Sequence, residues 1–420
     1  MKSENSFTRN VATLLTGNSI AQLIPIILTP ILARLYSPDD FGTLGLFVAI
    51  SGVLAIIATA RYESAVMVVP EDNDAINLAL LGLLLASCFS LILFAFGIIF
   101  NSLIATFLGD EKLGLWITLI PLIVWLTGTF NILTSLNLRK KYYKDLAKAN
   151  IYKSCFGIFP QICLGVLKAG FPGLIIGNII SNFAVNLKLF HKIKQSFGFS
   201  GISFKRSFLL GKQHIDFPLH NAPPSLLNAA GVQLPLIFIP KLFGLSIAGQ
   251  FFLAQRMIDL PCAIFSKPIS QVFFQTMVEK NQNGETTIPF LFKTMKRLVL
   301  IIFPIIIVSY LISPYLFRFI FGEQWVQAGQ IAQYLSLAIL IRFIVSPLSS
   351  VFSITGFQKR GAIWKYSYFV TSSLALSFAS LFSLDLKSFL FIFVVHEYSL
   401  YSIHLYLIIK STRAMDLKLS

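Results

Sequence analysis

Charged residues are scarce in this sequence, and their scarcity excludes an ordinary water-soluble protein. Only 12% of its 420 residues are Asp, Glu, Lys or Arg, whereas 55% are hydrophobic. A soluble globular domain carries about 25% charged residues. Apolar runs of about 18 residues or more recur along the whole chain, and each is long enough to cross the hydrocarbon core of a bilayer as a helix. We therefore expect an all-α integral membrane protein.

Motifs that carry covalent chemistry are also missing. The chain has no GxxxxGK[ST] phosphate loop, no HExxH zinc motif and no GxSxG nucleophile elbow. Its cysteines, Cys88, Cys155, Cys163 and Cys262, show no CxxC or metal-ligand spacing and lie in or beside apolar runs. We therefore expect a protein that is not an enzyme and has no catalytic residue, metal site or cofactor. A membrane protein of this kind that transports a substrate would use an ion gradient or the gradient of the substrate itself, because the phosphate loop that binds ATP is missing.

The apolar runs predict about twelve transmembrane helices, and an even number places both termini on one side of the membrane. The predicted spans are approximately residues 11–32, 43–60, 76–100, 114–137, 152–168, 171–190, 218–240, 244–265, 298–313, 331–353, 364–383 and 388–409. The longest polar stretch outside the termini follows the sixth span. We therefore expect an N-terminal six-helix lobe over 1–190, a cytoplasmic linker over 191–217 and a C-terminal six-helix lobe over 218–420.

Acidic residues are few compared with basic ones, since 18 Asp and Glu stand against 34 Lys and Arg. Most of the basic residues lie in loops on the side of the termini. The loops on the other side hold Arg34, Lys112, Lys168, Lys241, Arg318 and Lys387. Loops rich in Lys and Arg stay in the cytoplasm, so we expect both termini there. Because topology explains the positive charge, we expect the lipid bilayer as a partner and not nucleic acid.

Charged residues inside predicted spans are candidates for function, since a charge near the bilayer centre costs at least ~2.5–3.5 kcal/mol unless it is paired or lines water. Arg256 and Asp259 stand three residues apart in the eighth span, where Arg256 either pairs with Asp259 or contacts an anionic substrate. Arg342 lies in the tenth span and Glu397 in the twelfth. We predict that Arg256 and Arg342 bind substrate and that Asp259 and Glu397 couple transport to an ion.

Two further arginines lie at the ends of the first two spans. Arg34 ends the first span, and Arg61, with Glu63 beside it, ends the second. A long basic side chain at a helix end can reach the membrane interface, and this snorkelling explains both positions without any function. The alternative is that both arginines contact an anionic substrate, and we include Arg34 and Arg61 among the predicted substrate-binding residues.

Amide side chains form stripes on two of the predicted helices. Asn18 and Gln22 in the first span, and Asn178 and Asn182 in the sixth, are each four residues apart. Residues at this spacing lie on one face of a helix. Such amides either join neighbouring helices or hydrogen-bond the hydroxyl groups of a sugar. Because several would surround one cavity, we predict that these four residues bind substrate.

Three stretches of the sequence resemble a single family. They are Ala33–Gly42 (ARLYSPDDFG), Arg61–Ala65 (RYESA) and Ala254–Pro261 (AQRMIDLP). Together with the six-plus-six pattern of spans, they resemble polysaccharide repeat-unit flippases of the O-antigen (Wzx) type. These flippases belong to the multidrug/oligosaccharidyl-lipid/polysaccharide (MOP) exporter superfamily. The resemblance is densest near the N-terminus, and the C-terminal third matches mainly in hydropathy.

The resemblance implies a MATE-like fold of two helical lobes that works by alternating access. It implies that the chain flips undecaprenyl-pyrophosphate-linked oligosaccharide from the cytoplasmic to the outer leaflet of the bacterial inner membrane, for O-antigen or capsule synthesis. In the related lipid II flippases, arginines near the end of the first helix and in the eighth are taken to hold the pyrophosphate, and Arg34 and Arg256 match those positions. A coupling ion (H⁺ or Na⁺) and other polysaccharide-assembly membrane proteins are further expected partners.

Two other functions remain open on the sequence alone. A cation-coupled multidrug antiporter of the same superfamily would use acidic residues in its cavity. The first span here has no acid, and the charge inside the spans leans to arginine. A membrane polysaccharide polymerase or ligase would be expected to carry a large outer loop with polar functional residues, and the predicted spans leave no such loop. We therefore place the flippase first.

Overall fold

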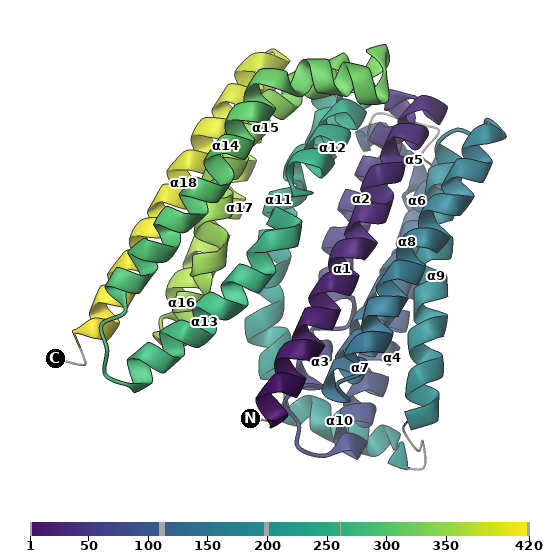
Figure 1. Ribbon diagram of the computed structural model, residues 1–420. Helices are drawn as coiled ribbons and strands as arrows, with labels where there is room; N and C mark the ends of the chain where they lie inside the picture. The colour runs from purple at the N-terminus through teal and green to yellow at the C-terminus, as the bar shows by residue number, and fades with distance from the viewer. Residues whose placement is uncertain (1, 109–113, 197–200, 261, 418–420) are drawn as a thin grey trace. The chain divides into compact units, whose positions relative to one another are not determined.

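The chain is all-helical in the computed structural model, which describes residues 2–108, 114–196, 201–260 and 262–417 (Figure 1). All regular secondary structure in these residues is helix, so the predicted all-α class is confirmed. The chain divides into two compact units, Met1–Gly249 and Gln250–Ser420. Each unit is described by itself.

Long helices joined by short turns make up the first unit. They are α1 (Lys2–Leu35), α2 (Pro38–Ala58), α3 (Tyr62–Ala65), α4 (Asp72–Ile99), α5 (Asn101–Leu108), α6 (Gly114–Ile117), α7 (Ile120–Arg139), α8 (Tyr143–Val166), α9 (Phe171–Ser196), α10 (Phe204–Gln213), η3 (Phe217–Asn221) and α11 (Ala222–Phe243). Helix α12 (Leu245–Ile258) begins at the end of this unit. In Figure 1, α1, α8 and α9 lie side by side. Helix α9 also packs on α7, and α7 contacts both α2 and α4.

The second unit holds the remaining helices. They are η4 (Cys262–Ser266), α13 (Lys267–Gln282), α14 (Ile288–Phe321), η5 (Glu323–Trp325), α15 (Val326–Val345), η6 (Ser346–Ser350), α16 (Val351–Ile354), α17 (Gln358–Leu381) and α18 (Leu386–Asp416). Helix α14 packs on α15, α15 on α18, and α18 on α17. The Asp416 carboxylate at the end of α18 accepts hydrogen bonds from the Thr287 and Ile288 backbone N–H groups, both at 3.0 Å. These bonds satisfy donors that the first turn of α14 would otherwise leave unpaired.

Within the described residues, nine helices are long and apolar enough to cross a membrane. A multi-pass membrane protein is thereby confirmed. The other three predicted spans coincide with α8, α12 and α17. Helices α8 and α17 carry several lysines and arginines near one end, and α12 has only 14 residues. The total of twelve spans and the cytoplasmic location of the termini stay predictions.

Ser37 and Asp40 form a capping box that begins α2. Ser37 Oγ accepts a hydrogen bond from the Asp40 backbone N–H at 3.2 Å, and Asp40 Oδ2 accepts one from the Ser37 backbone N–H at 2.9 Å. Asp40 Oδ1 accepts a further bond from the Phe171 N–H at 2.7 Å. One carboxylate therefore satisfies donors at the starts of two helices, α2 and α9.

Two glycines let α2 and the start of α12 approach backbone to backbone. A Cβ atom on Gly42 would lie 2.1 Å from the Leu245 carbonyl oxygen, and one on Gly249 would lie 1.8 Å from the Pro38 carbonyl oxygen. Contacts this short are impossible for real side chains, so both positions require glycine. The second half of the motif Ala33–Gly42, from Ser37 to Gly42, therefore has a structural role: it caps α2 and lets α2 pack closely on the start of α12.

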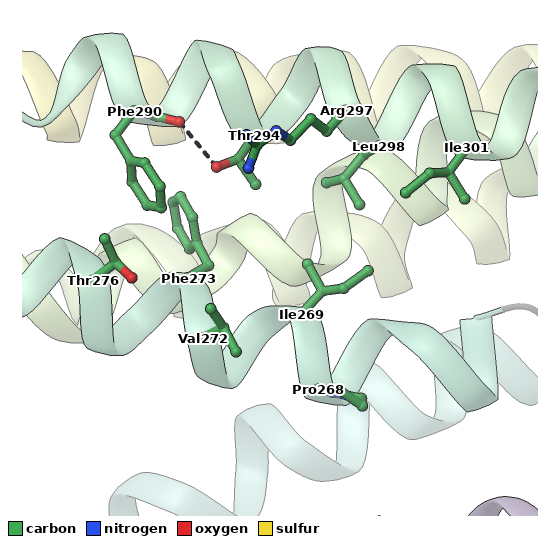
Figure 2. Close-up of a pocket in the computed structure, with 10 residues that line it drawn as sticks. All are labelled: Pro268, Ile269, Val272, Phe273, Thr276, Phe290, Thr294, Arg297, Leu298 and Ile301. Atoms are coloured by element: carbon green, nitrogen blue, oxygen red, sulfur yellow. Dashed lines mark hydrogen bonds between the residues drawn. The ribbon is translucent and has the colours of Figure 1, made fainter.

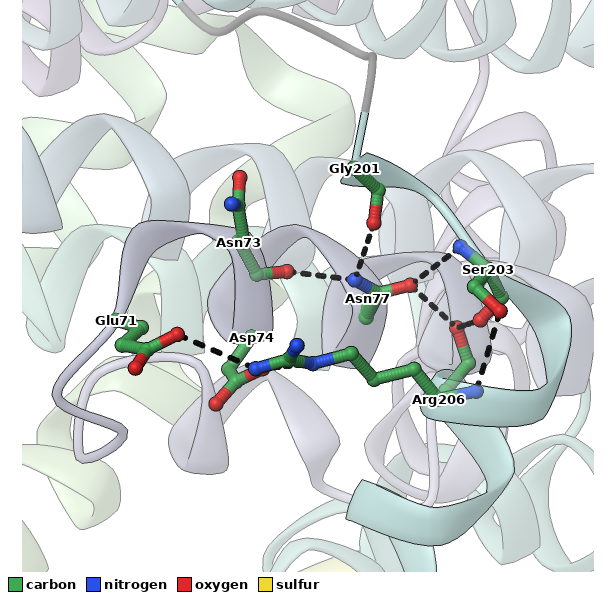
Figure 3. Close-up of polar contacts among 8 residues, drawn as sticks. Glu71, Asn73, Asp74, Asn77, Gly201, Ser203 and Arg206 are labelled. Carbon is green, nitrogen blue, oxygen red and sulfur yellow. Dashed lines mark hydrogen bonds and ion pairs between the residues drawn. The ribbon is translucent and has the colours of Figure 1, made fainter.

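Most of the polar stretch 191–217 is helical, and α10 within it lies against α4 (Figure 3). The buried Asn77 side chain accepts a hydrogen bond from the Ser203 backbone N–H at 2.8 Å. Arg206 Nε donates to Asp74 Oδ1 at 2.6 Å. This segment is thus held on the first unit by specific contacts, while its role as a linker between two six-helix lobes stays a prediction.

Candidate functional site

An ion pair lies inside the second unit where α15, α17 and α18 meet. Arg342 of α15 donates to Glu397 Oε2 of α18, with 2.6 Å from Nη2 and 3.2 Å from Nε. The other Glu397 oxygen accepts a hydrogen bond from the Tyr368 hydroxyl of α17 at 2.6 Å. The Glu397 side chain is fully buried, and that of Arg342 is 17% exposed. Both oxygens of the carboxylate are therefore satisfied, as a buried charge requires.

Asp259 lies at the edge of this pair. Its Oδ1 is 3.8 Å from Arg342 Nη1, and its side chain is 38% exposed. If Arg342, Glu397 and Asp259 are all ionised, the group carries one net negative charge. A proton or a small cation that binds at Asp259 would neutralise that charge. The structure thus brings together three of the predicted residues, Arg342, Asp259 and Glu397, in one network.

Arg256 stands apart from this network, although it is only three residues from Asp259. Helical spacing still holds here, because the Asp259 backbone N–H donates to the Gln255 carbonyl oxygen at 2.8 Å, yet Asp259 does not pair with Arg256. Its carboxylate lies beside Arg342. In the described part of the chain, Arg256 makes no ion pair with an Asp or Glu side chain.

The two predicted arginines of the first unit differ in the same way. Arg61 pairs with Glu63 at 3.0 Å, and the Thr59 hydroxyl also donates to Glu63. Arg61 itself has a left-handed backbone conformation with φ of 63°. Arg34 lies exposed in the last turn of α1 and, among the described residues, has no acidic partner. Arg61 and Arg342 thus each pair with a carboxylate. Arg34 and Arg256 have no acidic partner in the part of the chain that the structure describes.

One of the four predicted amides, Asn18, joins two helices of the first unit. Asn18 Oδ1 of α1 accepts a hydrogen bond from Asn150 Nδ2 of α8 at 2.6 Å. Asn182 Nδ2 donates to Asn178 Oδ1 on the same helix at 3.0 Å. Gln22 is exposed on α1. Asn18 therefore acts as an interhelical contact, and Gln22 is the predicted amide that solvent or a ligand can reach most easily.

Two residues of interest carry no clear signal in the sequence. Tyr368 lies in an apolar run, and its contact with Glu397 depends on how α17 and α18 pack. Lys153 of α8 places its amine 4.3 Å from the centre of the Phe130 ring, a cation–π contact. The sequence shows a lysine at the start of the predicted span 152–168. It does not show that this lysine contacts an aromatic ring on α7.

Among the described residues, no group of three or more His, Cys, Asp and Glu side chains is placed to hold a metal ion. The candidate residues are fixed charges and amides, and each unit holds its own set. The first unit holds Arg34, Gln22 and the amide contacts. The second holds Arg256 and the Arg342 network.

Solved structures with the same fold are transporters of the MOP superfamily. The chain matches the inward-facing conformation of a multidrug resistance MATE transporter with a TM-score of 0.70 and 16% sequence identity, over 96% of this chain and 95% of the other. It matches a MOP superfamily transporter from Pyrococcus furiosus, described as having a binding pocket of reverse polarity, with a TM-score of 0.68 and 14% identity. That match covers 97% of this chain and 96% of the other. The predicted MATE-like fold is confirmed.

Two curated relatives take part in polysaccharide synthesis. The chain is 22% identical over 345 residues to the succinoglycan biosynthesis transport protein ExoT of Rhizobium meliloti (strain 1021), covering 82% of this chain and 67% of ExoT. It is 25% identical over 166 residues to the teichuronic acid biosynthesis protein TuaB of Bacillus subtilis (strain 168), covering 39% of this chain and 34% of TuaB. The match thus spans about a third of TuaB's length.

A family model for polysaccharide biosynthesis proteins matches residues 31–330, which is well over half of the chain. This range includes all three stretches on which the sequence resemblance rests, Ala33–Gly42, Arg61–Ala65 and Ala254–Pro261. The proteins that share its fold are transporters and not enzymes. The chain belongs to the polysaccharide biosynthesis protein family, on the transporter fold of the MOP superfamily.

Proposed function

We propose that this protein is a flippase for undecaprenyl-pyrophosphate-linked oligosaccharide repeat units. It moves them by alternating access from the cytoplasmic to the outer leaflet, for the synthesis of a surface polysaccharide such as O-antigen or capsule. The family and the transporter fold support a membrane carrier that serves polysaccharide synthesis. One relative is a succinoglycan transport protein and another is a teichuronic acid biosynthesis protein, and both names agree with a saccharide cargo.

The observation that carries the proposal is the unpaired state of Arg256. Arg342 and Arg61 are neutralised by carboxylates, whereas Arg256 and Arg34 have no acidic partner in the described chain. An arginine at membrane depth is costly unless an opposite charge compensates it. A pyrophosphate carries at least two negative charges, and the planar guanidinium binds phosphate oxygens in pairs while always remaining charged. Arg256 and Arg34 therefore suit a pyrophosphate ligand.

The Arg342 network supports a coupling role beside substrate binding. Asp259 is the partly exposed member, and its carboxylate lies 3.8 Å from the arginine. An entering H⁺ or Na⁺ would weaken the attraction between Asp259 and Arg342 and free Asp259 from α15. Coupling in this proposal therefore acts through the contact between the end of α12 and α15.

Reconstitution with defined lipids tests the function directly. Purified protein in proteoliposomes is given a fluorescent undecaprenyl-pyrophosphate oligosaccharide, and the fraction that reaches the other leaflet is measured with an impermeant quencher. Wild-type protein is expected to move the lipid. Since a hydrogen bond to a charged group contributes about 1.5–3 kcal/mol, Arg256→Ala is expected to lose about tenfold or more of the rate. Arg256→Lys keeps the positive charge but loses the planar guanidinium that binds two phosphate oxygens at once, so it should retain partial activity.

Arg318→Ala is the matched control, because Arg318 lies in the same unit but forms an exposed pair with Glu323. It is expected to flip lipid at the wild-type rate. A well-expressed Arg256→Ala protein with normal flipping would refute the substrate contact.

The phenotype of a deletion strain distinguishes the proposed flippase from the two alternative functions. Lipid-linked repeat units on the cytoplasmic leaflet indicate the flippase, hypersensitivity to drugs indicates a cation-coupled multidrug antiporter, and shortened polymers indicate a polymerase or ligase.

A further inference from the structure

Helices α13 and α14 of the second unit diverge from the turn that joins them and leave an apolar wedge with a volume of about 510 Å³ (Figure 2). Phe273 of α13 and Phe290 of α14 close its narrow end. Their rings stack with centroids 5.7 Å apart and 12° between the ring planes. Ile269 and Ile301 line the wider end of the wedge. A volume of this size is typical of small-molecule sites, which commonly hold about 300–1,000 Å³.

Arg297 is the charged residue among those that line the wedge. In Figure 2 its guanidinium lies beside Thr294, and Thr276 stands on the opposite wall. Arg297 is exposed and, within the part of the chain that the structure describes, pairs with no Asp or Glu side chain. An apolar wedge with a single cation and two hydroxyl groups fits an amphipathic anion.

The position of Arg297 along α14 fixes its depth in the membrane. From Leu298 to Phe317 the helix carries no charged residue. These roughly twenty residues rise about 30 Å, which is the thickness of the hydrocarbon core. Arg297 therefore stands at one boundary of that core, where lipid headgroups lie. Ile301 lies one helical turn deeper, among the acyl chains.

We propose that this wedge is a binding site for an anionic phosphoglyceride of the surrounding leaflet. The phosphate lies on Arg297, beside the Thr294 hydroxyl, and one acyl chain lies along Ile269 and Ile301. The lining offers one positive charge, which matches the single negative charge of a phosphodiester. A pyrophosphate carries at least two, so the wedge suits a structural lipid better than the carrier lipid of the cargo. The site does not depend on the proposed cargo.

Native mass spectrometry of the detergent-purified protein measures this binding, with phosphatidylglycerol as the probe and phosphatidylcholine and undecaprenyl pyrophosphate as comparisons. We expect phosphatidylglycerol to bind most tightly. Arg297→Ala should weaken its binding by about tenfold, the effect of losing one hydrogen bond between charged groups. Ile269→Trp fills the wedge but keeps Arg297, and it should abolish binding as well.

Lys296→Ala is the matched control, since Lys296 is exposed on the neighbouring position of α14 but does not line the wedge. It removes the same charge and is expected to leave phosphatidylglycerol binding unchanged. Equal binding by wild type, Arg297→Ala and Ile269→Trp would overturn the proposal. Equal losses in Lys296→Ala and Arg297→Ala would show general attraction to a basic surface and would overturn it too. Tighter binding of undecaprenyl pyrophosphate than of phosphatidylglycerol would assign the wedge to the carrier lipid instead.

Discussion

The two carboxylates of the second unit differ in how firmly the protein holds them. Both oxygens of the buried Glu397 are hydrogen-bonded, one by Arg342 and one by Tyr368. The carboxylate of Asp259 is partly exposed and lies 3.8 Å from Arg342, which is beyond hydrogen-bonding distance. A carboxylate that is partly exposed and held by a longer contact can take up a cation with less rearrangement than Glu397 can. Asp259 is therefore the better candidate for ion coupling, and Glu397 holds the Arg342 guanidinium in place through two hydrogen bonds.

Substitutions of these two acids are expected to have different effects. Glu397→Gln removes the carboxylate that Arg342 hydrogen-bonds and leaves only the more distant Asp259 as its acidic neighbour in the network. Breaking a buried pair in this way costs about 3–5 kcal/mol. We expect lower abundance and a lower unfolding temperature. Asp259→Asn should fold normally and flip lipid at a rate that no longer depends on the H⁺ or Na⁺ gradient. Thermal unfolding in detergent and flipping under imposed gradients measure both effects.

Two outcomes contradict this assignment. One is a Glu397→Gln protein as stable as the wild type, which would mean that the pair contributes nothing to the fold. The other is an Asp259→Asn protein whose flipping still follows the ion gradient. The double variant Arg342→Met with Glu397→Leu serves as a control for stability, because replacing a whole buried pair by apolar residues is often neutral or stabilising.

The sequence identified the charged members of this network but not their partners. Arg342, Asp259 and Glu397 are visible because a charge inside an apolar run is costly and rare. Their meeting is not visible, since Arg342 and Glu397 are 55 positions apart. Spacing on one helix allowed a pair between Arg256 and Asp259, but the Asp259 carboxylate lies beside Arg342, which belongs to another helix, α15. Tyr368 is uncharged and has no signal in the sequence.

At the scale of helices, the packing of α10 could not be predicted from the sequence. Its segment is polar, and this composition does not show which helices α10 contacts. Its contacts come from distant positions: Asn77 Nδ2 donates to the Gly201 carbonyl, 124 positions away, at 3.0 Å. The Tyr62 hydroxyl of α3 donates to the Gly211 carbonyl at 2.9 Å. Hydropathy therefore predicts the positions of the long helices well, because each depends on its own apolar run. It cannot predict that a polar segment docks on another helix.

We predict that Asn77 controls the docking of α10. Asn77→Ala removes the hydrogen bonds to the Gly201 carbonyl and the Ser203 backbone N–H, and each such bond contributes about 0.5–1.5 kcal/mol. Backbone amides of residues 201–213 should then exchange with deuterium faster, while those of α4 below this contact stay protected. Hydrogen exchange read by mass spectrometry measures the change.

Arg206→Ala is the comparison variant on the same surface. Arg206 pairs with Asp74 and Glu71, but its side chain is 47% exposed. Exposed ion pairs contribute about 0–1 kcal/mol, so this variant should change exchange in 201–213 only slightly. If Arg206→Ala exposes the segment as much as Asn77→Ala does, the surface charges hold α10 and the buried amide does not.

At the scale of the whole molecule, contacts in the first unit connect helix ends that are predicted to lie on the same side of the membrane. Asp72, the first residue of α4, binds both Arg139 and Lys140 at the end of α7, at 2.8 and 2.5 Å. Helix α10 joins this group through the pairs of Arg206 with Glu71 and Asp74. At the opposite helix ends, Asp40 binds the start of α9. These groupings agree with the alternation of loops that the predicted spans require, and the richly basic group is the one expected in the cytoplasm.

Cysteine labelling decides which side is which, and with it the direction of transport. In a background without the four native cysteines, Asp39→Cys and Lys144→Cys place one exposed thiol in each group of loops. Because the loops around Lys144 carry most of the basic charge, we expect an impermeant maleimide to label Asp39→Cys in intact cells and Lys144→Cys only after permeabilisation. Labelling of Lys144→Cys in intact cells would reverse the orientation. Arg34, at the end of α1 beside Asp39, would then meet the cytoplasm, and the proposed entry and exit sides of the pyrophosphate would exchange.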